Sequence, residues 1–169
     1  MTQTVSYTSL SELLSQNRSP DSIVCFDDKS EITWQTFNDD LSQLVHLLSP
    51  FPVQRVAICT QDSYLFSLAF LACAVNKKHI ILPGNYQPCA LAELSEHFDC
   101  LLVDDSIGEV EVSDVRNVQT LLSSNTESQK PLIDNLTTID LAATQLTLFT
   151  SGSSGTPKAI NKTLEHLDI

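Results

Sequence analysis

The sequence has 169 residues and a mass of 18.6 kDa, and 42% of its positions are hydrophobic while 18% are charged. This composition excludes a disordered chain and is typical of one globular domain with a buried core. Nine Lys and Arg residues against 21 Asp and Glu residues give a formal net charge of −12. Nucleic acids and anionic membranes bind basic surfaces, so we expect no nucleic acid and no membrane among the partners.

The amino terminus has no basic segment followed by an apolar run, and the longest nearly continuous apolar run covers only residues 65–75. A bilayer-spanning helix needs about 20 residues. The five cysteines are Cys25, Cys59, Cys73, Cys89 and Cys100. Their number is odd, they are widely spaced, and they include no Cys-x-x-Cys pair and no histidine at metal-binding spacing. We therefore expect reduced thiols in the core, no metal site and a cytoplasmic protein.

The first third of the chain alternates between short apolar segments and turns. A short helix is expected over residues 9–16, and two strands joined by a turn over residues 23–26 and 31–33. Thr33 is expected to cap the next helix, whose apolar face is formed by Phe37, Leu41, Leu44, Val45 and Leu48.

Apolar strands and helices alternate over the next fifty residues. Strands are expected at 56–60, 79–82 and 100–103, separated by a buried helix over 64–75 and a shorter helix over 90–97. Strands that are apolar on both faces are typical of a parallel sheet covered on two sides, so the predicted fold class is α/β, a mostly parallel sheet flanked by helices. The pattern then weakens, and we expect a solvated acidic surface at Asp104, Asp105, Glu109, Glu111 and Asp114.

A last predicted strand, 145–149, runs directly into a loop rich in glycine and hydroxyl groups. Two of the four glycines of the chain, Gly152 and Gly155, lie in this loop. A loop of this kind between a strand and a helix presents backbone amides to phosphate oxygens, so we expect a phosphate-binding loop followed by a helix. A flexible Ser/Gly linker is the alternative interpretation, and the preceding apolar strand and the following Pro157-Lys158 argue against it.

The loop is not a Walker A motif, because Gly155 is followed by Thr156 and Pro157 rather than by lysine. It is neither a nucleophile elbow nor a dinucleotide fingerprint. Residues 149–159, Phe-Thr-Ser-Gly-Ser-Ser-Gly-Thr-Pro-Lys-Ala, instead closely resemble the phosphate loop of the adenylate-forming enzymes, which include acyl-CoA synthetases, non-ribosomal peptide adenylation domains and luciferases. The match departs only at Ala159, where glycine is usual. Residues 32–37, 54–58 and 68–83 are similar to upstream segments of the same family.

The resemblance implies an ATP-dependent carboxylic acid ligase that forms an acyl-adenylate and passes the acyl group to a thiol. It implies ATP and Mg²⁺ as cofactors, a small carboxylic acid as substrate, and coenzyme A or carrier-protein phosphopantetheine as acceptor. No catalytic residue and no metal ligand is expected within this chain. The residues that would hold the β- and γ-phosphates of ATP are Thr150, Ser151, Gly152, Ser153, Ser154, Gly155, Thr156 and Lys158.

Members of this family run to several hundred residues. The resemblance therefore implies that residues 1–169 are the N-terminal portion of the large AMP-binding domain, ending just after the phosphate loop (149–159) and part-way along the helix expected to follow it. We expect such a fragment to be inactive alone and to dimerise through surface that a longer protein would bury. Two alternatives stay open: a complete, non-catalytic binding module that keeps the fold for a partner protein or phosphate ligand, and an unrelated phosphate-binding α/β domain.

Overall fold

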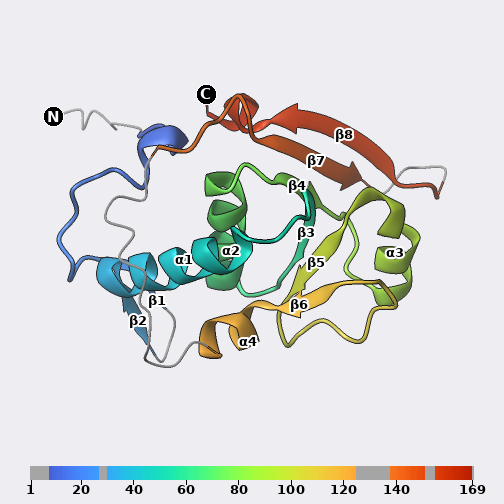
Figure 1. The fold of residues 1–169 in the computed structure, drawn as a ribbon, viewed down its shortest axis with the longest axis horizontal. Helices are drawn as coiled ribbons and strands as arrows, with labels where there is room; N and C mark the ends of the chain where they lie inside the picture. The colour runs from blue at the N-terminus through green and yellow to red at the C-terminus, as the bar shows by residue number, and fades with distance from the viewer. Residues whose placement is uncertain (1–7, 27–29, 125–137, 151–154, 169) are drawn as a thin grey trace, which may run out of the picture.

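The computed structural model describes residues 8–26, 30–124, 138–150 and 155–168, which form two sheets and the helices around them (Figure 1). Strands β1 (Ile23–Phe26) and β2 (Glu31–Thr33) pair antiparallel in a small separate sheet. The main sheet has the strand order β6-β5-β3-β4-β7-β8, and all of its pairs are parallel except that of β8 with β7. Its strands are β3 (Arg55–Cys59), β4 (His79–Leu82), β5 (Cys100–Val103), β6 (Val115–Asn117), β7 (Gln145–Thr150) and β8 (Lys158–Thr163).

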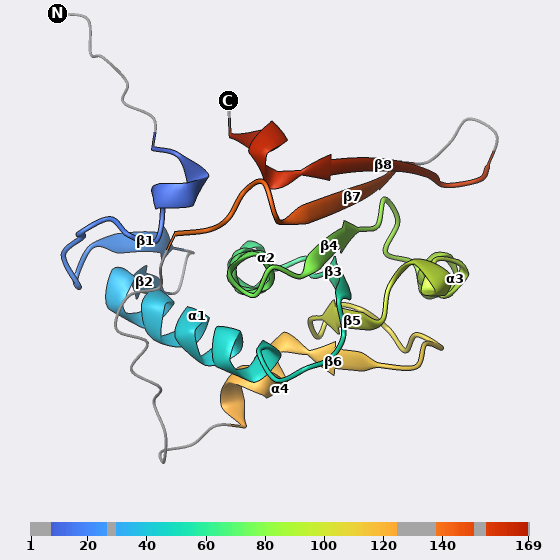
Figure 2. The same ribbon diagram turned by 45° about the horizontal axis from the view of Figure 1, so that its top comes forward.

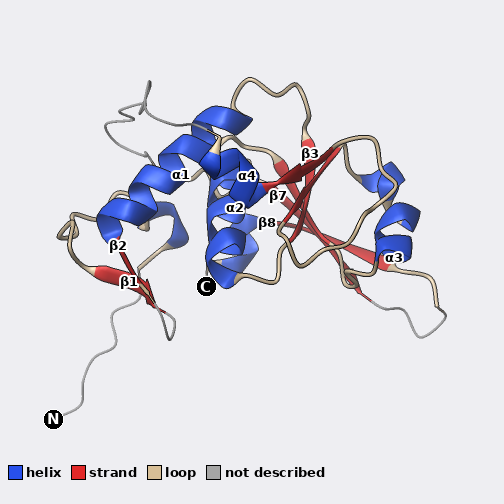
Figure 3. Cartoon of the chain, turned by 90° about the horizontal axis from the view of Figure 1, so that it is seen from below, coloured by secondary structure: helices blue, strands red, loops and turns tan. Residues whose placement is uncertain are grey.

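Helices cover the main sheet on both faces, as Figures 2 and 3 show. One face carries α1 (Trp34–Leu48), α2 (Ser63–Val75) and α4 (Val118–Ser123), and the opposite face carries α3 (Pro88–Glu93). Short 3₁₀ turns are η1 (Leu10–Glu12), η2 (Ser95–His97) and η3 (Leu164–Leu167). The predicted fold class, a mostly parallel sheet flanked by helices, is confirmed.

Side-chain caps fix where the two long helices begin. The Thr33 hydroxyl accepts the N–H of Thr36 at the start of α1, and the Asp62 carboxylate accepts the N–H of Leu65 at the start of α2. The predicted apolar face of α1 is buried as expected. Helix α2 is apolar nearly all round because α1 packs on one side of it and the sheet on the other.

The strands separate two apolar cores because successive side chains point to opposite faces. In β3, Val56 and Ile58 pack into the core beneath α1 and α2, whereas Ala57 and Cys59 pack into the smaller core beneath α3. Because both faces of β3 are buried, its sequence is a continuous apolar run and does not alternate between apolar and polar residues.

The helix predicted after the glycine-rich loop is wrong, because residues 158–163 form strand β8. Each of its six residues is paired antiparallel with β7, from Gln145↔Thr163 to Thr150↔Lys158. One edge of β7 pairs with β4, and β8 satisfies the backbone groups of the other edge. A helix dipole therefore contributes nothing at this end of the loop.

Four smaller expectations also need correction. The helix expected over 9–16 is reduced to η1, and the helix expected over 90–97 is divided into α3 and η2. The region after residue 104, which shows no clear pattern, contains β6 and α4. All five cysteines are free thiols, but Cys89 is exposed and Cys25 half-buried, so the expected core position holds only for Cys59, Cys73 and Cys100.

In the described ranges, no helix combines the length and apolar character needed to cross a membrane.

The core beneath α2 provides a stability test. Leu68 lies in α2 and is fully buried, whereas Leu167 in η3 is 53% exposed. Leu68→Ala should lower the free energy of unfolding by about 2–5 kcal/mol, since it removes buried methyl groups and leaves a cavity. Leu167→Ala should change it by less than about 0.5 kcal/mol. Urea unfolding followed by circular dichroism measures both, and equal losses for the two variants would contradict the packing described.

Candidate functional site

The carboxyl ends of β3, β4, β5 and β7 lie at one edge of the main sheet, because these four strands are parallel. Open α/β sheets bind ligands at this edge, above all where successive connections run in opposite directions. Such a switch point lies between β3 and β5, because β4 follows β3 on one side and β5 lies on the other. The end of β7, where the predicted phosphate loop begins, is a second place at the same edge.

The switch point between β3 and β5 is filled by the side chain of Asp104. One carboxylate oxygen, Oδ2, accepts the main-chain N–H groups of Gln61 at 2.6 Å and Asp62 at 2.9 Å. The other, Oδ1, accepts the N–H of Ser106 at 3.0 Å and also its hydroxyl. Asp104 thus occupies the amino end of α2 with a negative charge, where it repels a phosphate.

Asp104 is only 4% exposed, so its predicted place on a solvated acidic surface is wrong. Burial by itself disfavours the ionised carboxyl group, but the hydrogen bonds from Asp62, Ser106 and Gln61 outweigh that effect and lower the pKa of Asp104 below its ordinary value of 3.8. The rest of the acidic stretch is largely as expected, with Asp105, Glu109 and Glu111 exposed.

The end of β7 presents the described part of the predicted phosphate loop. Thr150, the last residue of β7, is paired with Lys158, the first residue of β8, and both side chains are exposed. Gly155 adopts a φ of 82°, which is costly for any residue with a side chain, and Thr156 beside it is exposed. Among the predicted site residues, four lie outside the described residues: Ser151, Gly152, Ser153 and Ser154.

The residue before the loop is anchored in the smaller core. Phe149 is 5% exposed and belongs to the cluster beneath α3 that includes Ile81, Leu91 and Phe98. The His97 ring lies against it, with the two ring centroids 4.9 Å apart. The end of the β7–β8 hairpin at which the loop begins lies on the α3 side of the molecule in Figures 1 and 2. The start of the loop is therefore held to α3 as well as to the sheet.

A chain of side-chain hydrogen bonds joins β4, β7 and β8. The Thr147 hydroxyl donates to Asn161 Oδ1 at 2.7 Å, and its oxygen lies 2.8 Å from His79 Nε2. Since the hydroxyl proton is directed at Asn161, His79 Nε2 carries the proton that it donates to Thr147. Burial, and then the charge of Arg55, lower the pKa of His79, so the neutral ring is favoured. The three residues are far apart in the sequence, which is why sequence analysis did not find them.

A surface cavity of about 320 Å³ lies at the opposite edge of the sheet, near the amino ends of β3, β4 and β7. The residues lining it are Gln54, Arg55, Lys77, His79, Ala143 and Gln145. Its position separates it from the predicted phosphate loop, which begins at the carboxyl end of β7.

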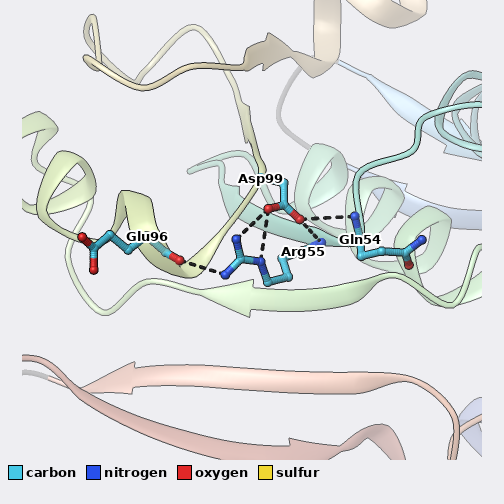
Figure 4. Close-up of polar contacts among 4 residues, drawn as sticks. All are labelled: Gln54, Arg55, Glu96 and Asp99. Atoms are coloured by element: carbon cyan, nitrogen blue, oxygen red, sulfur yellow. Dashed lines mark hydrogen bonds and ion pairs between the residues drawn. The ribbon is translucent and has the colours of Figure 1, made fainter.

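The cations of this cavity are already neutralised within the protein. Arg55 donates to Asp99 Oδ1 from Nη2 at 2.6 Å and to the carbonyl oxygen of Glu96 at 2.8 Å, as Figure 4 shows. Lys77 forms an ion pair with Asp140 at 3.2 Å. The mutual hydrogen bonds of Arg55 and Asp99 raise the pKa of the guanidinium and lower the pKa of the carboxyl group. The cavity therefore offers little unbalanced positive charge to an anion.

Comparisons with known proteins show similarity of fold. No protein-family model and no curated protein matches the sequence. The N-terminal subdomain of NpsA from Klebsiella oxytoca, in complex with 3-hydroxybenzoyl-AMSN, is 21% identical, with a TM-score of 0.62 over 88% of this chain. O-succinylbenzoate coenzyme A synthetase (MenE) from Bacillus subtilis, in complex with AMP, is 18% identical, with a TM-score of 0.63 over 85% of this chain. MatB from Rhodopseudomonas palustris is 16% identical, with a TM-score of 0.66 over 93% of this chain.

The described fold is thus that of the N-terminal part of adenylate-forming enzymes. This chain spans 39% of the NpsA and MenE chains and 34% of the MatB chain. The structural similarity extends over most of the sequence.

The role of Asp104 predicts a pH-dependent loss of stability. Asp104→Asn should lower the free energy of unfolding by about 1.5–3 kcal/mol at pH 7, because a charged acceptor of several hydrogen bonds is lost. Since the folded-state pKa of Asp104 lies below 3.8, its contribution is present above that pH and is lost as the pH falls through the folded-state pKa. Urea unfolding at pH 7 and at low pH should show the difference from wild type shrinking in acid.

The matched control for this test is Glu109→Gln, which removes an exposed carboxylate from the same connection. It should change the free energy of unfolding by less than about 0.5 kcal/mol at either pH. A difference between Asp104→Asn and wild type that stays constant with pH would contradict the assigned role of Asp104.

Proposed function

We propose that this chain provides the phosphate-binding loop of an ATP-dependent carboxylic acid ligase of the adenylate-forming class. One observation carries the proposal: the sequence of residues 149–159 matches the phosphate loop of that class, and the strand before it ends at the ligand-binding edge of the same fold. Residues 1–169 would then be the N-terminal portion of the large AMP-binding domain, with residues 149–159 as its phosphate loop.

The proposed reaction has two steps. A carboxylate oxygen of the acid attacks the α-phosphorus of ATP, the bond to the bridging oxygen of the β-phosphate breaks, and pyrophosphate leaves. The thiol sulfur of the acceptor then attacks the acyl carbon and AMP departs. The groups that hold the leaving pyrophosphate act in the first step, because negative charge builds up on the bridging oxygen as the bond breaks.

This chain contributes charge and position to that first step. The Lys158 ammonium neutralises part of the charge of the β- and γ-phosphates, and the Thr150 and Thr156 hydroxyls donate hydrogen bonds to their oxygens. Gly155, with its φ of 82°, lets the main chain turn close to the phosphates. The remaining proposed contacts come from the part of the loop outside the described residues, Ser151, Gly152, Ser153 and Ser154.

Mg²⁺ enters the proposal with the nucleotide, whose phosphate oxygens it neutralises when bound. The described residues contain no group of three or more His, Cys, Asp or Glu side chains that could hold a metal ion. As the resemblance implies, no residue of this chain is proposed as a metal ligand or as a catalytic residue. We accordingly expect the chain to be inactive by itself.

The proposed substrate is a small carboxylic acid, and the proposed acceptor is coenzyme A or the phosphopantetheine of a carrier protein. The bound 3-hydroxybenzoyl-AMSN of NpsA and the name of MenE, a coenzyme A synthetase, support these classes. We place the activity in the cytoplasm, since all five cysteines are free thiols and an oxidising compartment favours disulfides.

A non-catalytic binding module is the second candidate. Exposed apolar side chains on β1 fit the partner surface that such a module needs, although a fragment of a longer ligase would expose them too. Phe26 is 77% exposed and Ile23 is 51% exposed. Apolar side chains of this size at a strand surface are suited to contact another polypeptide, in a dimer or in a longer domain. A module that retained the fold for a phosphate ligand would bind pyrophosphate but would not support exchange of pyrophosphate into ATP.

Lys158 and Lys162 form a matched pair for testing the ligase proposal. Both are exposed and lie in β8, but Lys158 is paired with Thr150 at the loop, whereas Lys162 is paired with Leu146 farther along the strand. In the gene product that carries this chain, Lys158→Ala should slow acid-dependent exchange of pyrophosphate into ATP by about 10²-fold, because it removes charge stabilisation of the leaving group. Lys162→Ala should leave the rate unchanged.

The acid concentration for half-maximal exchange should be similar in the parent and both variants, because neither lysine is proposed to contact the acid. Equal exchange rates for Lys158→Ala and Lys162→Ala would overturn the role given to Lys158. Binding of pyrophosphate without exchange, with any carboxylic acid, would favour the non-catalytic module.

A further inference from the structure

Gly84 makes an unusually close main-chain contact with the start of the predicted phosphate loop. It follows Pro83 at the carboxyl end of β4, the strand next to β7 in the sheet. A Cβ atom built on Gly84 would collide with the carbonyl oxygen of Phe149 and lie 3.5 Å from the Cα of Thr150. The main chain after β4 therefore packs directly against the main chain from which the loop departs.

The requirement for glycine at this position is one of space. Among the described glycines Gly155 has a positive φ, whereas Gly84 does not, so a left-handed backbone is not what requires glycine at position 84. The last residue pair between β4 and β7 is Leu82↔Leu148, and Pro83 has no N–H with which to extend the ladder. Beyond that pair, the main chain at Gly84 lies beside the main chain of Phe149, where a paired strand residue would otherwise lie.

Phe149 has little room to move away from a side chain at position 84. Its ring is buried in the cluster beneath α3 and lies against His97, and its main chain is paired with Ala159 of β8. A methyl group on residue 84 would meet main-chain atoms and could not be absorbed by a flexible side chain, so we expect it to displace the main chain at Phe149 and Thr150. Because Thr150 is paired with Lys158, the displacement reaches the lysine that the proposed function places on the phosphates.

We propose that Gly84 is a positioning residue for the phosphate site, and that its missing side chain sets the positions of Thr150 at the end of β7 and of its strand partner Lys158 in β8. The consequence for phosphate binding rests on the proposed function, whereas the contact itself does not. Gly84 is not proposed to contact phosphate. It acts only through the main chain of Phe149 and Thr150.

The chain contains a matched control for this proposal. Gly108 lies in the connection after β5, and a Cβ built on it would meet only the Pro88 Cγ atom at 3.7 Å, an ordinary van der Waals contact. Gly84→Ala and Gly108→Ala therefore add the same methyl group, but only the first adds it against the start of the loop.

The experiment compares Mg²⁺–pyrophosphate binding by the 169-residue chain and the two variants, using calorimetry at a temperature at which circular dichroism shows all three folded. Gly84→Ala should weaken binding by about tenfold or more, since a displacement of about 1 Å in a positioned group can cost up to about 10²-fold. Gly108→Ala should bind like the wild type. A role for Gly84 in stability alone would lower the melting temperature but leave the affinity of the folded variant unchanged, and that result would overturn the proposal.

Amide NMR spectra separate this proposal from the proposed function. If the wild-type chain does not bind pyrophosphate, the proposed function loses its support, but Gly84→Ala should still shift the Thr150 and Lys158 amide signals while Gly108→Ala does not. Unshifted signals in Gly84→Ala would overturn the positioning role. If Gly84→Ala does not fold, the wild-type spectrum decides: a nuclear Overhauser effect between α-protons of Gly84 and Thr150 is expected, and its absence would overturn the contact.

Discussion

The pairing of β7 on both of its edges determines the geometry of the candidate site. On one edge β7 runs parallel to β4, so its carboxyl end reaches the edge of the sheet where α/β folds bind ligands. On the other edge it runs antiparallel to β8, so the loop leaves and returns at the same place. As a result, Thr150 and Lys158 lie opposite each other although seven residues separate them in the sequence.

The local pattern of the sequence was sufficient to predict the buried elements. The apolar runs of β3, β4 and β5 and the apolar helix α2 are encoded in consecutive residues, and the caps Thr33 and Asp62 mark where helices begin. Strand β8 was predicted as helix because a helix commonly follows a strand and a phosphate-binding turn, and Lys-Ala-Ile-Asn-Lys-Thr has no distinct apolar period to indicate otherwise. Its conformation follows from the unpaired edge of β7, which is a non-local constraint. The short elements β6 and α4 are too brief to produce a recognisable pattern.

The phosphate loop itself remains a prediction from consecutive residues, the order of glycine, hydroxyl-bearing residues and lysine. The contacts around its described ends join distant segments and could not be predicted. The sequence indicates only that Gly84 is part of a turn after Pro83, and the structure shows its close approach to Phe149. Asp104 reads as one of several surface acids, yet its carboxylate fills the switch point between β3 and β5. Within the described residues, Asp104 makes the switch point unfavourable for an anion, and we keep the end of β7 as the proposed phosphate site.

The net charge of −12 repels polyanions over most of the surface. An acidic chain therefore binds a polyanion only where local positive charge and hydrogen-bond donors outweigh that repulsion. The most direct measurement is a titration of the ¹⁵N-labelled 169-residue chain with Mg²⁺–pyrophosphate, followed by amide NMR. If phosphate binds at the end of β7, the shifts should concentrate at Thr150, Gly155, Thr156 and Lys158. Shifts concentrated at the amino end of α2, or around Arg55 at the opposite edge of the sheet, would contradict it.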